Sequence, residues 1–154
     1  YMVGKGATTV WELWNGDTAD PAMNSGNHVM LVGDLLIWLN ESLAGIAPDP
    51  ARPGFKHILM RPVPVGDLAS VKASHASPYG TIRSEWSRKG GAFDWRVEVP
   101  ANATATVCVP APGIDAVTES GRALAKAEGV SLVRVESGAV VLEVGSGVYH
   151  FVVR

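Results

Sequence analysis

A glutamate between two tryptophans is the feature of this sequence best suited to chemistry. Glu12 lies between Trp11 and Trp14, and Asn27 and His28 follow a short way along the chain. A carboxylate can act as an acid or a base, and aromatic faces can stack on the C–H face of a sugar ring. Amide and imidazole groups can hydrogen-bond the sugar's hydroxyls. These residue types together are typical of a carbohydrate-processing cleft.

Glu12 has two competing interpretations. As a general base it must be ionised near neutral pH and must hold a water molecule against the reacting carbon. The stretch Thr9-Val10-Trp11-Glu12 also has the spacing of a capping box, in which Glu12 would hydrogen-bond the start of a helix with Thr9 as its partner.

The neighbouring residues have structural interpretations as well. Trp11 and Trp14 are three residues apart, which is also the spacing of two ordinary core residues on one helix face. His28 precedes an apolar segment, where it could cap or pack instead of binding a ligand. Asp17 and Asp20 could supply a second catalytic carboxylate, although turn residues are the favoured interpretation.

Composition narrows the possible functions. The chain has 154 residues, 47% of them hydrophobic and 18% charged, which indicates a globular protein. Its net charge of −2 comes without a basic block, so a nucleic-acid partner is not expected. The single cysteine, Cys108, excludes a disulfide framework and is interpreted as a small core residue.

No cofactor, metal or membrane partner is expected. His57, His75 and His150 are scattered and lack metal-ligand spacing. The longest apolar stretch, residues 29–39, is too short to span a bilayer. Because the sequence opens on Tyr1 in what looks like a cut into a longer protein, location is left open among cytoplasm, periplasm and secretion.

The first part of the chain has a helical pattern. Residues 25–44 carry apolar side chains at helical spacing, with Asn24 or Ser25 as the expected cap and Gly45 as the stop. A helix that is apolar nearly all round needs packing partners. The two or three helices expected in residues 1–46 therefore either dock on the rest of this chain or belong to a larger helical domain, and exposed helices could also drive homo-oligomerisation.

The rest of the chain is all β. Residues 47–54 hold three prolines and a glycine and are expected to form a linker. Residues 55–154 alternate apolar and polar residues between turn signals, which predicts an antiparallel, jelly-roll-like β-sandwich and a mainly β chain. The predicted strands cover residues 56–61, 68–75, 80–89, 92–99, 105–109, 131–136, 139–144 and 147–153.

Several motifs, in order and spacing over most of the chain, resemble the bacterial α-L-rhamnosidases, a family of glycoside hydrolases. The matching stretches are Gly6–Trp14, Met23–His28, Leu43–Ile46, Pro53–His57, Arg61-Pro62, Lys72–Ser74, Ser77–Gly80, Ser84–Trp86 and Val99–Ala105. The last forty residues or so match more loosely. The resemblance implies that residues 1–46 end a catalytic (α/α) barrel and that a C-terminal β-sandwich follows.

The resemblance also implies roles in an inverting hydrolysis of rhamnose-containing glycosides or polysaccharides. Glu12 is similar to the family's general base, and His28, with Asn27 beside it, is similar to its substrate-contacting histidine. Trp14 and Trp11 would line the site. The general acid would lie upstream, in the remaining N-terminal barrel, which is the expected partner of this chain, so the isolated fragment is expected to be inactive.

The β-sandwich has two further interpretations. It could be a carbohydrate-binding module, or it could be a purely structural brace. An exposed, flat pair formed by Trp86 and Trp95 would favour binding, but both tryptophans fall in alternating strands, where core positions are expected.

Overall fold

The chain separates into two compact units at Trp38. The computed structural model describes all 154 residues. Residues 1–38 form the first unit and residues 39–154 the second. No helix in either unit is long and apolar enough to cross a membrane.

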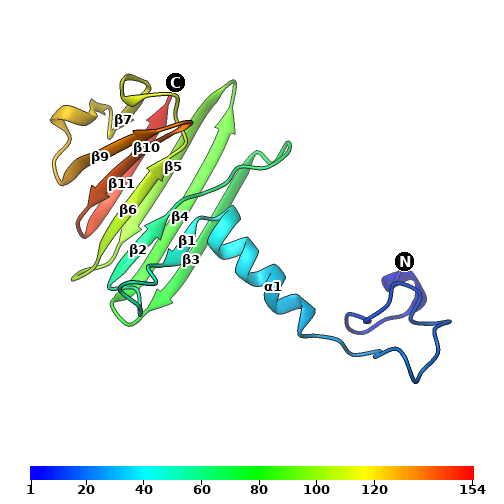
Figure 1. Cartoon of the computed structure of the whole chain (residues 1–154). Helices are drawn as coiled ribbons and strands as arrows, with labels where there is room; N and C mark the ends of the chain where they lie inside the picture. The colour runs from blue at the N-terminus through cyan, green and yellow to red at the C-terminus, as the bar shows by residue number, and fades with distance from the viewer. The chain divides into compact units, whose positions relative to one another are not determined.

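The first unit consists mostly of turns and contains one α-helix. A short 3-10 turn covers Val3–Lys5, and α1 covers Leu31–Ile37 (Figure 1). The chain then widens into a π-helical turn over Trp38–Leu43, which lies largely in the second unit. The predicted helix over residues 25–44 is therefore too long at its start, and one α-helix takes the place of the two or three that were expected.

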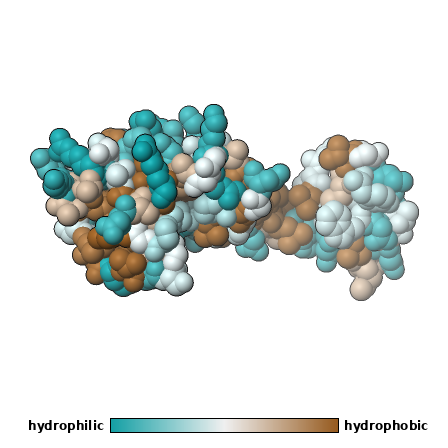
Figure 2. Space-filling model, turned by 90° about the horizontal axis from the view of Figure 1, so that it is seen from above, coloured by the Kyte–Doolittle hydropathy of each residue, from teal (hydrophilic) through white to brown (hydrophobic).

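The helix begins late because its predicted caps are used elsewhere. Met30 occupies the N-cap position of α1 and makes no side-chain capping bond. Asn24 and Ser25, the expected caps, instead bind the chain around Glu12. Apolar side chains cover α1 nearly all round, as the pattern predicts, and they lie on the surface as brown spheres in Figure 2. Those more than a third exposed are Leu31, Leu35, Leu36 and Ile37.

The second unit is a sandwich of two sheets (Figure 1). The five-stranded sheet has the order β1-β2-β6-β10-β9, formed by Ile46–Pro48, His57–Met60, Thr104–Val109, Ala139–Val144 and Val130–Glu136. The six-stranded sheet has the order β3-β4-β5-β11-β7-β8, formed by Ser70–Ser77, Gly80–Lys89, Ala92–Val99, Gly147–Val153, Val117–Glu119 and Arg122–Ala123. All neighbours are antiparallel except β2 and β6, which are parallel.

This architecture confirms the predicted mainly β, antiparallel sandwich. Strands β4, β5, β10 and β11 have the predicted bounds, and β2, β3, β6 and β9 differ by at most two residues at either end. Strands β1, β7 and β8 escaped prediction because two or three residues are too few to show alternation. Strand β1 covers Ile46–Pro48 and pairs with β2, so the first two residues of the expected linker, 47–54, belong to the sheet.

Alternation along the strands places the core between the two sheets. In β5, Phe93, Trp95, Val97 and Val99 are buried and face the core, while the residues between them point outward. The matching inward positions of β6 and β10 are also buried.

Buried polar groups tie the core to the chain that enters the sandwich. Ser84 Oγ donates a hydrogen bond to the carbonyl oxygen of Ala44 at 2.6 Å and accepts one from Trp95 Nε1 at 2.9 Å. Trp86 Nε1 donates to the carbonyl oxygen of Leu43 at 2.9 Å. Two main-chain acceptors thus find partners on the sheet, where water cannot reach them.

Gly45 completes this junction. Its φ is +75°, and a Cβ placed on it would lie 2.2 Å from the backbone nitrogen of Pro62. The carbonyl oxygen of Gly45 accepts the N–H of Arg61 at 2.9 Å. Only glycine fits both the left-handed conformation and the close approach, so the helix stop expected at this position is also a packing contact.

Replacing Ser84 with alanine should destabilise the sandwich by about 2 to 4 kcal/mol, because a buried Trp95 N–H and a buried Ala44 carbonyl oxygen lose their partner. Urea unfolding of the chain measures the change. Ser87→Ala on the exposed face of the same strand is the matched control and should change stability by less than about 0.5 kcal/mol. Equal effects of the two substitutions would contradict this account.

Candidate active-site half

Two segments of the first unit meet at Glu12. The N–H of Glu12 donates to the carbonyl oxygen of Ser25 at 3.0 Å, and the N–H of Ser25 donates back to Glu12 Oε2 at 3.0 Å. A further bond joins the N–H of His28 to the carbonyl oxygen of Val10 at 2.7 Å. The capping-box interpretation is therefore wrong, because Glu12 is not in a helix and its carboxylate binds Ser25.

This pairing brings His28 to Glu12 across a loop. His28 Nδ1 lies 3.7 Å from Glu12 Oε2, which is beyond hydrogen-bond length. Nδ1 is buried and has no hydrogen-bond partner, a situation that is uncommon in folded proteins and calls for an explanation. The side chain of Glu12 stays 42% exposed, so its carboxylate remains accessible to water or a ligand.

The two tryptophans differ in their surroundings. Trp14 is 80% exposed, so its ring is available for stacking. Trp11 is half-buried, and a Cβ added to Gly16 would lie 2.8 Å from its ring. Trp11 therefore packs against its own turn. Asn27 is exposed, and its N–H donates to Ser25 Oγ at 3.2 Å.

Asn24 makes two hydrogen bonds to the turn after Glu12 that the sequence analysis did not predict. Its Oδ1 accepts the N–H of Leu13 at 3.1 Å, and its Nδ2 donates to the carbonyl oxygen of Gly16 at 3.4 Å. The residue type indicates only that an asparagine side chain favours hydrogen bonds to nearby backbone groups. The partner lies eleven residues away, which no local pattern reveals.

The two loop aspartates do not resemble a general acid. The hydroxyl of Tyr1 donates to Asp17 Oδ1 at 2.7 Å and, together with Lys5, holds the pKa of Asp17 below its usual range. A general acid needs the opposite shift. Asp20 Oδ1 accepts the N–H of Ala22 at 2.9 Å, as expected of a turn residue.

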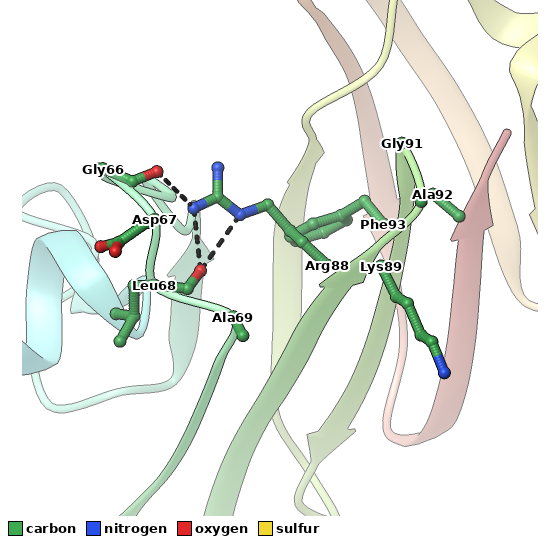
Figure 3. A pocket seen from close by; sticks show the side chains of 10 residues that line it. Gly66, Asp67, Leu68, Ala69, Arg88, Lys89, Gly91, Ala92 and Phe93 are labelled. Atoms are coloured by element: carbon green, nitrogen blue, oxygen red, sulfur yellow. Dashed lines mark hydrogen bonds between the residues drawn. The ribbon is translucent and has the colours of Figure 1, made fainter.

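The two tryptophans of the sandwich form no aromatic platform. Trp86 and Trp95 are 2% and 0% exposed, so they cannot form the flat surface pair that would have favoured a carbohydrate-binding module. A hollow of about 490 Å³ lies between residues 66–69 and 88–93 (Figure 3). Within it, Arg88 donates to the carbonyl oxygens of Leu68 and Gly66, so most of its donors already bind the protein.

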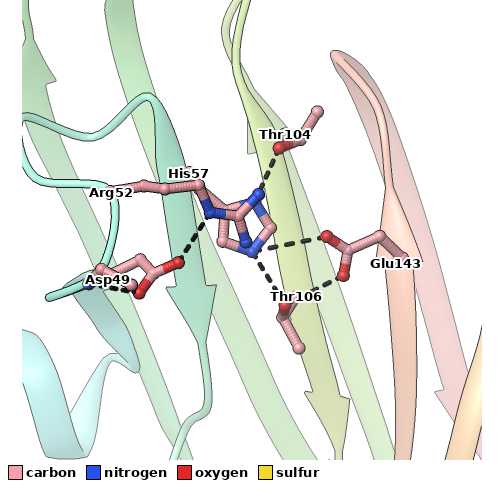
Figure 4. A network of polar contacts seen from close by, with 7 residues as sticks. Asp49, Arg52, His57, Thr104, Thr106 and Glu143 are labelled. Atoms are coloured by element: carbon pink, nitrogen blue, oxygen red, sulfur yellow. Dashed lines mark hydrogen bonds and ion pairs between the residues drawn. The ribbon is translucent and has the colours of Figure 1, made fainter.

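A buried histidine lies on the outer face of the five-stranded sheet (Figure 4). His57 Nδ1 lies 2.6 Å from Thr104 Oγ1, and Nε2 lies 2.8 Å from Thr106 Oγ1. Because Thr106 donates its own proton to Glu143 Oε2 at 2.9 Å, it must accept from Nε2–H, which leaves Nδ1 to accept from Thr104. The network thus satisfies a neutral imidazole on both nitrogens.

Burial lowers the pKa of His57 from its ordinary value near 6.5. The nearby carboxylate of Glu143 opposes this shift, Arg52 adds to it, and Asp49 opposes it. No group of three or more His, Cys, Asp or Glu side chains in the chain is arranged to hold a metal ion.

Comparison with known proteins assigns both parts of the chain. The sequence model described as the bacterial alpha-L-rhamnosidase C-terminal domain matches residues 45–123. The model of the 6 hairpin glycosidase domain of bacterial alpha-L-rhamnosidases matches residues 1–43. The chain belongs to the bacterial α-L-rhamnosidase family. The recognition made on sequence motifs is thereby confirmed.

Individual members of the rhamnosidase family are similar in sequence to this chain over nearly its whole length. An alpha-L-rhamnosidase of Streptomyces avermitilis is 37% identical over 99% of this chain and 14% of its own length. One from Formosa agariphila is 31% identical over 98% of this chain and 16% of its own length.

Solved structures show the same correspondence. The Streptomyces avermitilis alpha-L-rhamnosidase complexed with L-rhamnose superposes with a TM-score of 0.83 at 36% identity, over 100% of this chain and 14% of that one. The enzyme from Dictyoglumus thermophilum gives 0.81 at 35% identity, over 99% of this chain and 17% of that one. The chain thus spans about a sixth or less of these relatives.

The sandwich should lose stability as the pH falls below about 6.5. Because burial lowers the pKa of folded His57, the unfolded chain binds more protons there, and folding weakens by up to about 1.4 kcal/mol per pH unit. Urea unfolding at several values between about pH 7 and pH 5.5 measures this slope.

Two variants test the assignment to His57. His57→Gln should flatten the slope, whatever it does to stability at neutral pH. His75→Gln, which removes a histidine whose ring lies tilted against that of Phe55, should leave the slope in place. A slope that survives the loss of His57 would show that another group causes it.

Proposed function

We propose that this chain carries the water-activating half of an inverting α-L-rhamnosidase active site, with Glu12 as general base. The observation that carries the proposal is the paired hydrogen bonding of Glu12 and Ser25, which brings an accessible carboxylate beside His28. Both residues lie in the part of the chain that matches the family's glycosidase domain. Such a base takes a proton from the water that attacks the anomeric carbon.

The other residues have binding roles in this proposal. Trp14 offers its exposed ring to the apolar side of the sugar, whose methyl group favours such a wall. His28 and Asn27 hydrogen-bond sugar hydroxyls. Because Nδ1 of His28 has no hydrogen-bond partner, the ring can gain one by reorienting when the ligand binds. Trp11 supports the site from behind by packing on Gly16.

The general acid comes from another part of the longer protein. Inverting enzymes separate their two carboxyl groups by about 6.5 to 9.5 Å, so that water fits on one side of the sugar. Asp17 is ionised and tied to Tyr1 and Lys5, and Asp20 holds a turn, which disfavours both as the acid. The relatives' greater length leaves ample chain to supply it.

The proposal assigns a different role to each part of the chain. Residues 1–46 end the catalytic barrel, residues 47–54 connect it to the sandwich and begin within β1, and residues 55–154 brace the assembly without binding sugar. The buried positions of Trp86 and Trp95 favour this structural role over a carbohydrate-binding one. The intact protein releases terminal α-L-rhamnose from glycosides or polysaccharides.

Replacing Glu12 with glutamine in the full-length protein should lower kcat by about 10²- to 10⁴-fold, because the proton acceptor is lost. KM should stay close to that of the wild type, since the amide keeps the shape of the side chain. Hydrolysis of a nitrophenyl α-L-rhamnoside measures both constants. Asp20→Asn, on the following loop, is the control and should keep full activity; normal turnover by the Glu12 variant would refute its role as base.

The isolated chain of 154 residues should not hydrolyse the same rhamnoside, because it holds only one of the two carboxyl groups that inversion requires. The assay compares the purified chain with buffer alone and with its own Glu12→Gln variant. Release of nitrophenol above the buffer rate that disappears in the variant would mean that the chain contains a complete site.

A further inference from the structure

We propose that Asn24 is a positioning residue that fixes Glu12 in its catalytic orientation. The inference rests on the proposed function of Glu12 as general base. Asn24 does not touch the sugar in this proposal, and it acts through the chain on either side of Glu12.

The side-chain amide of Asn24 spans the turn that follows Glu12. Its Oδ1 accepts the N–H of Leu13 at 3.1 Å, and its Nδ2 donates to the carbonyl oxygen of Gly16 at 3.4 Å. One amide therefore holds the first and last residues of this turn. The N–H of Gly16 also donates to the carbonyl oxygen of Leu13 at 3.1 Å. The turn is therefore closed by its own backbone, and the side chain of Asn24 stabilises it further.

The residue after Asn24 holds Glu12 itself. Ser25 accepts the N–H of Glu12 and donates its own N–H to Glu12 Oε2, each at 3.0 Å. The side chain of Asn24 thus binds Leu13, and the main chain of Ser25 binds the preceding residue, Glu12. Without the amide, the Leu13 end of this pairing would rely on main-chain bonds alone.

Asn24 is suited to this task by its surroundings. It is half-buried, whereas Met23, Gly26 and Asn27 around it are exposed. A general base must be held within about half an ångström of its productive position, and a displacement of 1 Å can cost about 10²-fold in rate. The side chain of Asn24 uses both its acceptor and a donor to hold the turn that follows the base. These two hydrogen bonds can provide that precision.

The experiment uses the full-length protein and four variants: Asn24→Ala, Asn24→Asp, Asn15→Ala and Glu12→Gln. Asn24→Ala should lower kcat about 10- to 100-fold with KM within about twofold of wild type, because the base is displaced while the sugar contacts remain. Asn15→Ala is the matched control, since its amide lies on the same turn but reaches only the side chain of Thr18; its kcat should equal that of wild type.

Asn24→Asp gives a readout that a merely structural role would not move. The aspartate keeps an acceptor for the N–H of Leu13, so kcat should recover in part. Its added negative charge lies against the turn that follows Glu12 and disfavours the ionised base, so the acid limb of the kcat/KM profile should move to higher pH. His28 is the titratable group that faces Glu12, and Lys5 and Asp17 form a separate pair.

The outcomes separate this inference from the proposed function. Wild-type kcat in Asn24→Ala, or an unshifted acid limb in Asn24→Asp, overturns the role of Asn24 while an inactive Glu12→Gln leaves the base in place. An active Glu12→Gln overturns the proposed function and this inference with it. Reduced kcat in Asn24→Ala together with the shifted limb in Asn24→Asp supports the positioning role.

Discussion

Three side chains inside the sandwich determine how the chain enters it. Ser84 and Trp86 on β4 donate to the carbonyl oxygens of Ala44 and Leu43, and Trp95 on β5 donates to Ser84. All three side chains are almost fully buried, so these bonds form away from water, where an unmade bond is costly. The end of the π-helical turn is thereby part of the hydrophobic core, and β1, which follows Gly45, starts from a fixed point.

The two units place polar chemistry differently. In the sandwich, buried polar groups find partners within the protein, as His57 does with two threonines. In the first unit, a carboxylate stays accessible and a neighbouring imidazole nitrogen is buried without a partner. A buried group without a hydrogen-bond partner calls for an explanation, and a catalytic or binding role is one such explanation. This contrast supports the active-site half that we propose for the first unit.

The sequence predicts most of the strands because alternation is a local signal. In β5 each charged residue alternates with a buried apolar one, β4 and β10 end at recognisable turns, and β11 begins at one. The start of the helix could not be predicted in this way. Asn24 and Ser25 have the chemistry of helix caps, but a contact with residues eleven to thirteen positions earlier outweighs that local preference.

The candidate site was predicted only in part, for a related reason. Motif resemblance identified Glu12 and His28, and the structure places them close together. The bonds that bring them together are made mainly by main-chain groups of Val10, Glu12 and Ser25, and main-chain bonding leaves no signature in residue type. The network around His57 could not be predicted for a different reason, because its partners are side chains of β6 and β10 that lie far from it in the sequence.

The distribution of the five tryptophans has a spectroscopic consequence. Trp11, Trp14 and Trp38 belong to the first unit, where Trp14 and Trp38 are well exposed, whereas Trp86 and Trp95 lie in the core of the second. Indoles in water emit at longer wavelengths than indoles in an apolar core, so the emission of this chain has two components that belong to different units. The red component follows the surroundings of the segment that carries Glu12, and the blue component follows the integrity of the sandwich.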